Sequence, residues 1–343
     1  MHEAERSFPS RFPAGDDQAT PVSLTAGPAR FLITVDTEEA FDWTKPFSRE
    51  NRDTSHVHAV DRFQALCDDH GVKPVYLVDY PIMDDPAAAE LFGNICESGR
   101  GHVGMHLHPW VNPPHVEIVS DRNSYSCNLP PELERAKMIA LHEKIISAIG
   151  VRPEIYRAGR YGAGLVTAAV LQELGVRLDS SVRPLFDYQP QHGPDFSRGR
   201  LSPYWITPGQ LAELPLTTQF CGHLRGFGRT LFPFRAPGNR RSGFLSRSGM
   251  LERVPFTPEG VPAQKAIRAI DQAIEADLPL LNFSFHSPSL MPGNTPYVRT
   301  EADLASHYDW WRRILAHLKN RGVQPVSLDK LLAEIFCPTQ RRS

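Results

Sequence analysis

The stretch KPVYLVDYPIMDDPAAAELFGNICESGRGHVGMHLH, residues 73–108, contains two short apolar runs separated by a longer mixed segment. The runs at 73–79 and 102–108 have the length of buried strands, and the segment 86–99 between them has the length of a helix. This spacing predicts a strand–helix–strand unit in which the two strands are parallel.

The same alternation continues on both sides of this unit. A strand is predicted at 30–36, followed by a helix in which Val57, Val60, Phe63 and Leu66 recur at helical spacing before Gly71 ends it. Later strands are predicted at 152–159, 176–182, 211–218 and 278–286, and later helices at 131–150, 165–174, 264–276 and about 304–318. The pattern predicts an α/β fold with a mostly parallel sheet or barrel.

The predicted fold occupies one domain, residues 29–338. Residues 1–28 are polar, rich in proline and without periodicity, and we expect them to form a flexible leader. The segment GHLRGFGRTLFPFRAPGNRRSG also lacks periodicity, and it predicts an insert at about 220–245 on the substrate side.

Composition excludes several classes of protein. The formal net charge is -2, with 41% hydrophobic and 22% charged residues, which is typical of a globular chain and argues against a nucleic-acid partner. No apolar run reaches the roughly 18 residues of a membrane span. The acids and prolines of the first 21 residues are not those of a signal peptide, so we expect a cytoplasmic protein. The oligomeric state is left open.

Ionisable residues follow five of the predicted strands, at their carboxyl ends. In parallel α/β folds functional residues gather at these ends. The residues are Asp36 with Glu38 and Glu39, His106 with His108, Arg157, Asp179, and His286.

The sequence HLH predicts a pair of ligands. Side chains two apart in a strand lie on the same side, so His106 and His108 can reach one point. Two neutral imidazoles and a carboxylate form a common site for zinc or another transition metal. The alternative is two buried histidines that are satisfied by hydrogen bonds. His102 has the same parity, but we expect it to have a structural partner.

Three acids occur within four residues of TVDTEEAFDW. Their mutual repulsion indicates a shared cation or proton. Asp36 and Glu38 have equal parity, so one could ligate a metal while the other acts as a base. The alternative is a solvated acidic loop.

Three further strand ends carry one ionisable residue each. Arg157 could hold a carboxylate in a fixed orientation and lower its pKa, although a surface arginine is the alternative. His286 precedes a Ser-Pro turn at the rim, where it could act as a general acid. Asp179 could orient the His286 ring by accepting its other N–H.

In this order, the motifs resemble those of the polysaccharide deacetylase superfamily, carbohydrate esterase family 4 or the NodB-homology domain. TVDTE stands where that family has Thr-Phe-Asp-Asp, and GMHLHPW stands where it has Gly-x-His-x-x-x-His-Pro. YRAGRYG matches the third motif, LDSSV the fourth, and NFSFHS the final strand with its histidine. HLHPW together with DTEE is most similar to the branch that contains WalW-type proteins of O-antigen biosynthesis clusters.

The resemblance implies a distorted (β/α) barrel of about seven strands and a divalent ion, most often zinc, held by one carboxylate and two histidines. It implies that Asp36 is the catalytic base and that Arg157 orients it. It further implies that His286 is the general acid, supported by Asp179. His106 takes the place of the first metal histidine.

Two positions differ from the family pattern. Thr37 stands where the family has its metal aspartate, so Glu38, or Asp36 itself, has to supply the carboxylate. The second histidine, His108, follows His106 by two residues instead of four. We expect Glu38, His106 and His108 to be the ligands of a rearranged site; the alternative is a site where metal binds weakly or not at all.

The function predicted from this resemblance is removal of an N-acetyl group from a sugar or glycan precursor. Trp43, Trp110 and Tyr161 lie beside the motifs and could offer apolar faces to a sugar ring, or could simply belong to the core. Two alternatives stay open: an amidohydrolase that opens a small cyclic amide, and a glycan-binding homologue that has lost catalysis.

Overall fold

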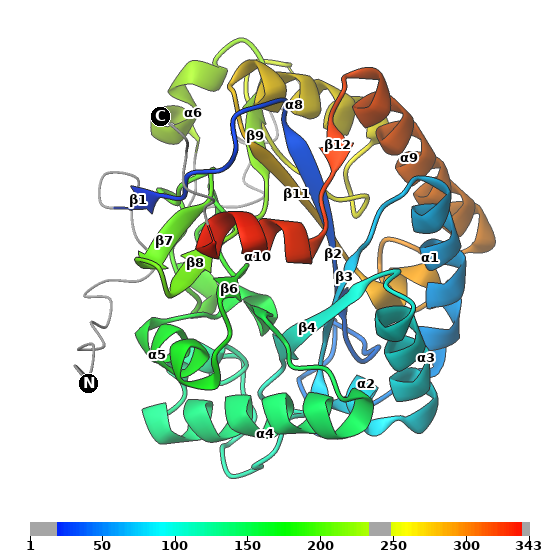
Figure 1. Ribbon diagram of the computed structural model, residues 1–343, viewed down its shortest axis with the longest axis vertical. Coiled ribbons are helices and arrows are strands. Elements are labelled where there is room, and N and C mark those ends of the chain that lie inside the picture. The colour runs from blue at the N-terminus through cyan, green and yellow to red at the C-terminus, as the bar shows by residue number, and fades with distance from the viewer. Residues whose placement is uncertain (1–18, 233–247, 338–343) are drawn as a thin grey trace.

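Figure 1 shows the computed structural model of the protein, which describes residues 19–232 and 248–337. A twisted main sheet runs through the middle, and helices surround it. Within the described residues this sheet has ten strands in the order β1-β7-β8-β6-β5-β4-β3-β2-β11, with β12 beside β2. The strands are β1 (Thr20–Pro21), β2 (Arg30–Thr37), β3 (Val75–Val78), β4 (His102–Leu107), β5 (Ile155–Ala158), β6 (Leu178–Asp179), β7 (Tyr204–Thr207), β8 (Leu211–Glu213), β11 (Leu280–His286) and β12 (Gln324–Pro325).

The centre of the sheet is parallel. Strands β11, β2, β3, β4, β5, β6 and β8 run parallel to their neighbours, whereas β7 and β1 are antiparallel at one edge. The prediction of an α/β fold with a mostly parallel sheet is therefore confirmed. All the parallel strands end at the same edge of the sheet, which brings their last residues together.

The sheet is not closed. Among the described residues no ladder joins β11 to β1, so the expected barrel of about seven strands is not confirmed. The chain after β8 is joined to β11 by individual hydrogen bonds and not by a ladder. Thr217 N donates to Asn282 O at 3.1 Å, and the side chain of Asn282 donates to Leu214 O at 3.1 Å. Pro215 lies in this bridging segment and has no N–H to extend a ladder.

Helices cover the outer face of the sheet (Figure 1). They are α1 (Val60–Asp69), α2 (Tyr80–Asp84), α3 (Pro86–Glu97), α4 (Pro131–Ile149), α5 (Leu165–Leu174), α8 (Ala263–Glu275) and α9 (Glu301–Asn320). Phe63, Phe92, Leu141 and Trp311 from four of these helices are buried in one apolar cluster with the outward side chains of the strands. This cluster is the main core.

The inner face of the sheet has a second apolar core, and α10 (Leu328–Phe336) fills it. Leu331, Leu332 and Ile335 of this helix are buried against strand residues such as Leu32 and Leu178. In Figure 1 α10 crosses in front of the strands. Because Asp329 at its start lies 3.6 Å from His102 at the start of β4, the helix covers the amino end of the strands.

Several segments differ from the sequence prediction. Thr20 and Pro21 pair with β7, so the predicted leader is wrong for this part, while residues 1–18 lie outside the described residues. The strand predicted at 211–218 is broken at Pro215 into β8 and β9 (Thr218–Cys221), and β9 pairs with β10 (Glu252–Pro255). The predicted insert begins at the end of β9 and continues through the short helices η5 (Arg225–Phe227) and α6 (Gly228–Leu231), and its residues 233–247 lie outside the described part. None of the described helices combines the length and the apolarity of a membrane span.

Replacing Leu331 by alanine tests the inner core. Leu331 is fully buried, so Leu331→Ala should lower the free energy of unfolding by about 2–5 kcal/mol. Lys330→Ala, at the exposed next position, should change it by less than about 0.5 kcal/mol. Urea denaturation measures both values, and equal effects would mean that α10 does not seal a packed core.

Candidate active site

Asp36 and His286 lie side by side because β2 and β11 are parallel neighbours. The register pairs the two residues directly. Alternation along each strand puts them on the inner face, the same face as Leu32 and Leu280 of the inner core. Nε2 of His286 lies 3.8 Å from Oδ2 of Asp36. The structure thus brings the predicted base and the predicted acid together.

The buried guanidinium of Arg157 holds the other oxygen of Asp36. Nη1 of Arg157 forms an ion pair with Oδ1 of Asp36. Nη2 donates to Thr34 Oγ1 at 2.7 Å and to Ser180 Oγ at 2.9 Å, and Nε donates to the Ser180 carbonyl at 2.8 Å. Asp36 is therefore held between two cationic side chains, one on each oxygen.

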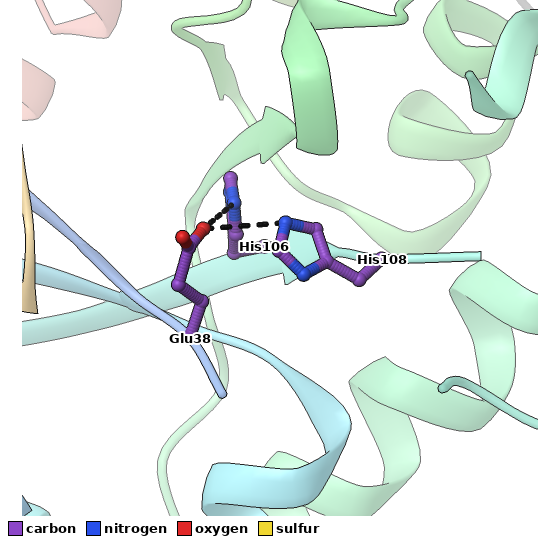
Figure 2. Close-up of side chains that lie close together, drawn as sticks. All are labelled: Glu38, His106 and His108. Atoms are coloured by element: carbon purple, nitrogen blue, oxygen red, sulfur yellow. Dashed lines mark hydrogen bonds and ion pairs between the residues drawn. The ribbon is translucent and has the colours of Figure 1, made fainter. Parts of the chain in front are cut away.

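Glu38, His106 and His108 form a buried cluster, shown in Figure 2. Oε2 of Glu38 lies 3.2 Å from Nε2 of His106 and 3.2 Å from Nε2 of His108. One ligand atom from each residue lies within 4.8 Å of the others. Burial alone would raise the pKa of Glu38, but the charges of His286 and His108 lower it, so the carboxylate is ionised.

The donor set of this cluster fits a divalent ion. Two imidazoles and one carboxylate are a common ligand set for zinc and for other transition metals. Nδ1 of His106 donates to the Arg157 carbonyl at 3.1 Å, and Nδ1 of His108 lies 2.9 Å from Oε2 of Glu39. Because both Nδ1 atoms have hydrogen-bond acceptors, both Nε2 atoms would be available to bind a divalent ion.

A second layer of acids supports His108. The carboxylate of Glu39 lies beside His108 and also accepts from Trp110 Nε1 at 2.9 Å. The backbone N–H of Glu39 donates to Oδ2 of Asp79 at 2.9 Å. Burial and the nearby charge of Glu39 raise the pKa of Asp79 well above its usual range. Glu39, Asp79 and His108 are also close enough to form a second ligand group, but the contacts of Glu39 favour a supporting role.

The hydroxyl of Thr37 is turned away from this cluster. It is buried and donates to the Val35 carbonyl at 3.0 Å. Strand alternation places Thr37 on the face opposite Asp36. The structure groups Glu38, and not Asp36, with the two histidines.

Glu259, and not Asp179, supports His286. Oε2 of Glu259 lies 2.7 Å from Nδ1 of His286, and Oε1 accepts from the backbone N–H of His286 at 3.1 Å. Oε1 also accepts from Ser289 Oγ at 2.6 Å. Glu259 belongs to the chain between β10 and α8, far from every predicted strand end.

The prediction that Asp179 orients His286 is therefore wrong. Leu178 faces the inner core, so alternation puts Asp179 on the other face of β6. There it is paired with Glu213 of β8 and accepts from Ser181 Oγ. Burial raises the pKa of Asp179 to about 6 and raises that of Glu213 well above its usual range, which indicates a buried acid pair that retains a proton.

Sequence reasoning missed two of the supporting acids. Asp79 directly follows β3, and the strand-end rule that selected the other residues would have found it. Glu259 precedes Gly260, which has a φ of +75°, in a turn that no periodicity identifies. Only the hydrogen bond of the folded chain, across 27 positions, assigns Glu259 to His286.

The three predicted sugar-binding aromatics have different environments. Trp110 is buried and stacks on His108 with centroids 4.2 Å apart, so it is part of the support of the site and not a sugar platform. Trp43 is 42% exposed and packs on Phe41 at 4.1 Å. Tyr161 is half-buried on the loop after β5 and can still offer a face.

Comparison with known proteins gives a distant likeness in structure alone. No family model matches the chain, and no curated protein matches it. A provisionally assigned polysaccharide deacetylase from Mycobacterium smegmatis has 17% identity and a TM-score of 0.45, and the match covers 91% of this chain and 98% of that one. A family 4 carbohydrate esterase pseudoenzyme from Bacillus anthracis has 8% identity and a TM-score of 0.44, covering 90% and 66%.

Solved structures with another reaction also match. A family 57 branching enzyme from Pyrococcus horikoshii has 11% identity and a TM-score of 0.49, and the match covers 89% of this chain and 70% of that one. At these TM-scores and identities the likenesses do not identify the reaction. The site itself has to support any function.

Metal analysis of two histidine variants tests the cluster. His106→Ala removes one of three ligands and should abolish stoichiometric metal in the purified protein. His102→Ala, on the same strand but beside Asp329 at its other end, should keep it. Inductively coupled plasma mass spectrometry measures both, and equal occupancy in the two variants would remove His106 from the site.

Proposed function

We propose that this protein is a metal-dependent hydrolase that removes an N-acetyl group from an amino sugar or a glycan precursor. One observation carries the proposal: the Glu38–His106–His108 cluster and the Asp36–His286 pair lie at the carboxyl ends of neighbouring parallel strands. Metal ligands, a carboxylate and an imidazole are the groups that amide hydrolysis needs. We expect zinc, and the WalW-type branch with a role in surface polysaccharide synthesis stays a prediction.

Glu38, His106 and His108 would hold the ion. A divalent ion at this position would polarise the acetamide carbonyl and make water more acidic. Asp36 accepts the proton that water loses as its oxygen bonds to the carbonyl carbon. The ion pair with Arg157 fixes the orientation of the Asp36 carboxylate.

His286 completes the reaction as the acid. It donates a proton to the nitrogen as the carbon–nitrogen bond breaks, so the products are acetate and a free amine. Burial alone would lower the pKa of His286, but the charges of Glu259 and Glu38 and the hydrogen bond to Glu259 raise it to about 10. The ring therefore keeps its proton at neutral pH and is ready to donate it.

The deacetylase proposal predicts release of acetate. Wild-type protein loaded with zinc should release acetate from N-acetylated sugars, and Asp36→Asn should lower kcat by about 10²–10⁴-fold because the base is lost. Asp42→Asn, exposed on the following loop, should leave kcat unchanged. Chromatographic detection of acetate gives the rates.

Two outcomes of the same experiment would favour the alternatives. Ring-opening of cyclic amides without any acetate release would make the protein a cyclic amidohydrolase. A metal-loaded protein with neither activity would favour a glycan-binding homologue without catalysis.

The pH profile tests the role of Glu259. A general acid works only while protonated, so activity falls as pH rises through its pKa. Because Glu259 raises the pKa of His286, Glu259→Gln should move the alkaline limb of kcat/KM to lower pH, and Glu259→Asp should restore part of the shift. Ser289→Ala removes a hydrogen bond from Glu259 but not its charge, and should leave the limb in place. An unshifted limb in Glu259→Gln would refute this positioning role.

A further inference from the structure

Two arginines meet on one aromatic ring beside the candidate active site. Cζ of Arg183, in the chain after β6, lies 4.1 Å from the centroid of Phe186, and Cζ of Arg253, on β10, lies 3.5 Å from it. Nη1 of Arg253 donates to the Leu185 carbonyl at 2.6 Å, and Nη1 of Arg183 donates to Tyr188 Oη at 3.1 Å. Both arginines are half-buried, so part of each side chain is still accessible.

Neither of these guanidinium groups has a carboxylate partner in the part of the chain that the structure describes. Other arginines do: Arg157 pairs with Asp36, and Arg52 pairs with Asp84 at 2.8 Å. Burial lowers the pKa of Arg253 to about 10, and the charge of Arg183 contributes to this shift. Two like charges on one ring, with no carboxylate of the described residues paired to either, repel each other, and a bound anion would relieve the repulsion.

Tyr161 connects the arginine pair to the predicted base. Cζ of Arg183 lies 5.2 Å from the centroid of Tyr161, whose ring lies 5.5 Å from that of Tyr188. Burial raises the pKa of Tyr161, and the charge of Asp36 adds to the shift, so this ring is within electrostatic reach of both Asp36 and Arg183. Tyr161 has a φ of +62°, a strained conformation that is concentrated at functional sites.

The second arginine is connected to the predicted acid. The chain runs from Arg253 through Phe256, whose carbonyl accepts from Ser284 N of β11 at 3.1 Å, to Glu259 beside His286. Arg183 is thus connected to Asp36 through Tyr161, and Arg253 is connected to His286 through the chain that ends at Glu259.

We propose that Arg183 and Arg253, with the rings of Tyr161 and Phe186, form a subsite for a phosphate group on the substrate. This inference rests on the proposed function and narrows its substrate to an N-acetylated sugar that carries a phosphate or diphosphate ester. Guanidinium groups bind phosphate oxygens with paired, charge-assisted hydrogen bonds. Two guanidinium groups that contact the same ring supply two positive charges for a diphosphate, and the aromatic faces can stack on a sugar or a base.

Binding measurements test the subsite independently of catalysis. Isothermal titration calorimetry with N-acetylglucosamine, N-acetylglucosamine 1-phosphate and UDP-N-acetylglucosamine should give affinities at least tenfold higher for the phosphorylated sugars. Preference for the UDP-sugar over the 1-phosphate would assign a diphosphate, and the reverse a monophosphate. Arg183→Gln and Arg253→Gln should each remove most of the preference, and Arg253→Lys should keep part of it.

Arg62→Gln is the matched control, because Arg62 also stacks on an aromatic ring, 4.2 Å from the centroid of Tyr308, but on the outer helices. It should bind all three sugars as wild type does. Equal affinities for neutral and phosphorylated sugars, or a preference that survives in both glutamine variants, would overturn the subsite. So would a preference that EDTA abolishes, since a metal ion would then hold the phosphate.

Activity separates the two proposals. Deacetylation of neutral sugars with an unchanged kcat/KM in the arginine variants would keep the proposed function and reject the subsite. Arginine-dependent binding of phosphorylated sugars without acetate release would keep the subsite and reject the deacetylase.

Discussion

The buried ion pair between Arg157 and Asp36 is the constraint on which the site depends. Removing two charges from water is costly, and such a pair persists only when the remaining N–H groups and oxygens have partners. Thr34 and Ser180 supply these partners, so the pair ties β2, β5 and β6 together. Asn282 extends the network to β11 by donating to Ser180 Oγ at 3.0 Å. The same contacts that fix the strands fix the predicted base.

The inner face of the sheet is built in layers. An apolar layer sealed by α10 fills the amino end, the polar network around Arg157 follows, and the Glu38–His106–His108 cluster and His286 lie at the carboxyl end. The layers are coupled, because Nδ1 of His106 donates to the carbonyl of Arg157. A displacement of β5 would therefore move a predicted metal ligand and the partner of Asp36 together.

The site residues were predicted from two rules: side chains alternate along a strand, and functional residues lie at the carboxyl ends of parallel strands. They located Asp36, Glu38, His106, His108 and Arg157, which the structure brings together in one region. These two rules failed where the position of a residue depends on contacts between distant parts of the chain. Asp179 ends a strand but faces outward, and only the position of Leu178 in the inner core reveals this. Glu259 reaches His286 from a turn, and Pro215 interrupts the strand predicted at 211–218, an effect that depends on which strands would have met there.

The position of Glu259 has a consequence for how this protein could diversify. The residues proposed to activate water come from the central strands, where a substitution disturbs the core. Glu259, whose charge and hydrogen bond help to raise the pKa of His286, comes from the connection between β10 and α8. In the proposed mechanism, exchanging one residue of that connection would shift the alkaline range of the reaction and leave the buried framework intact.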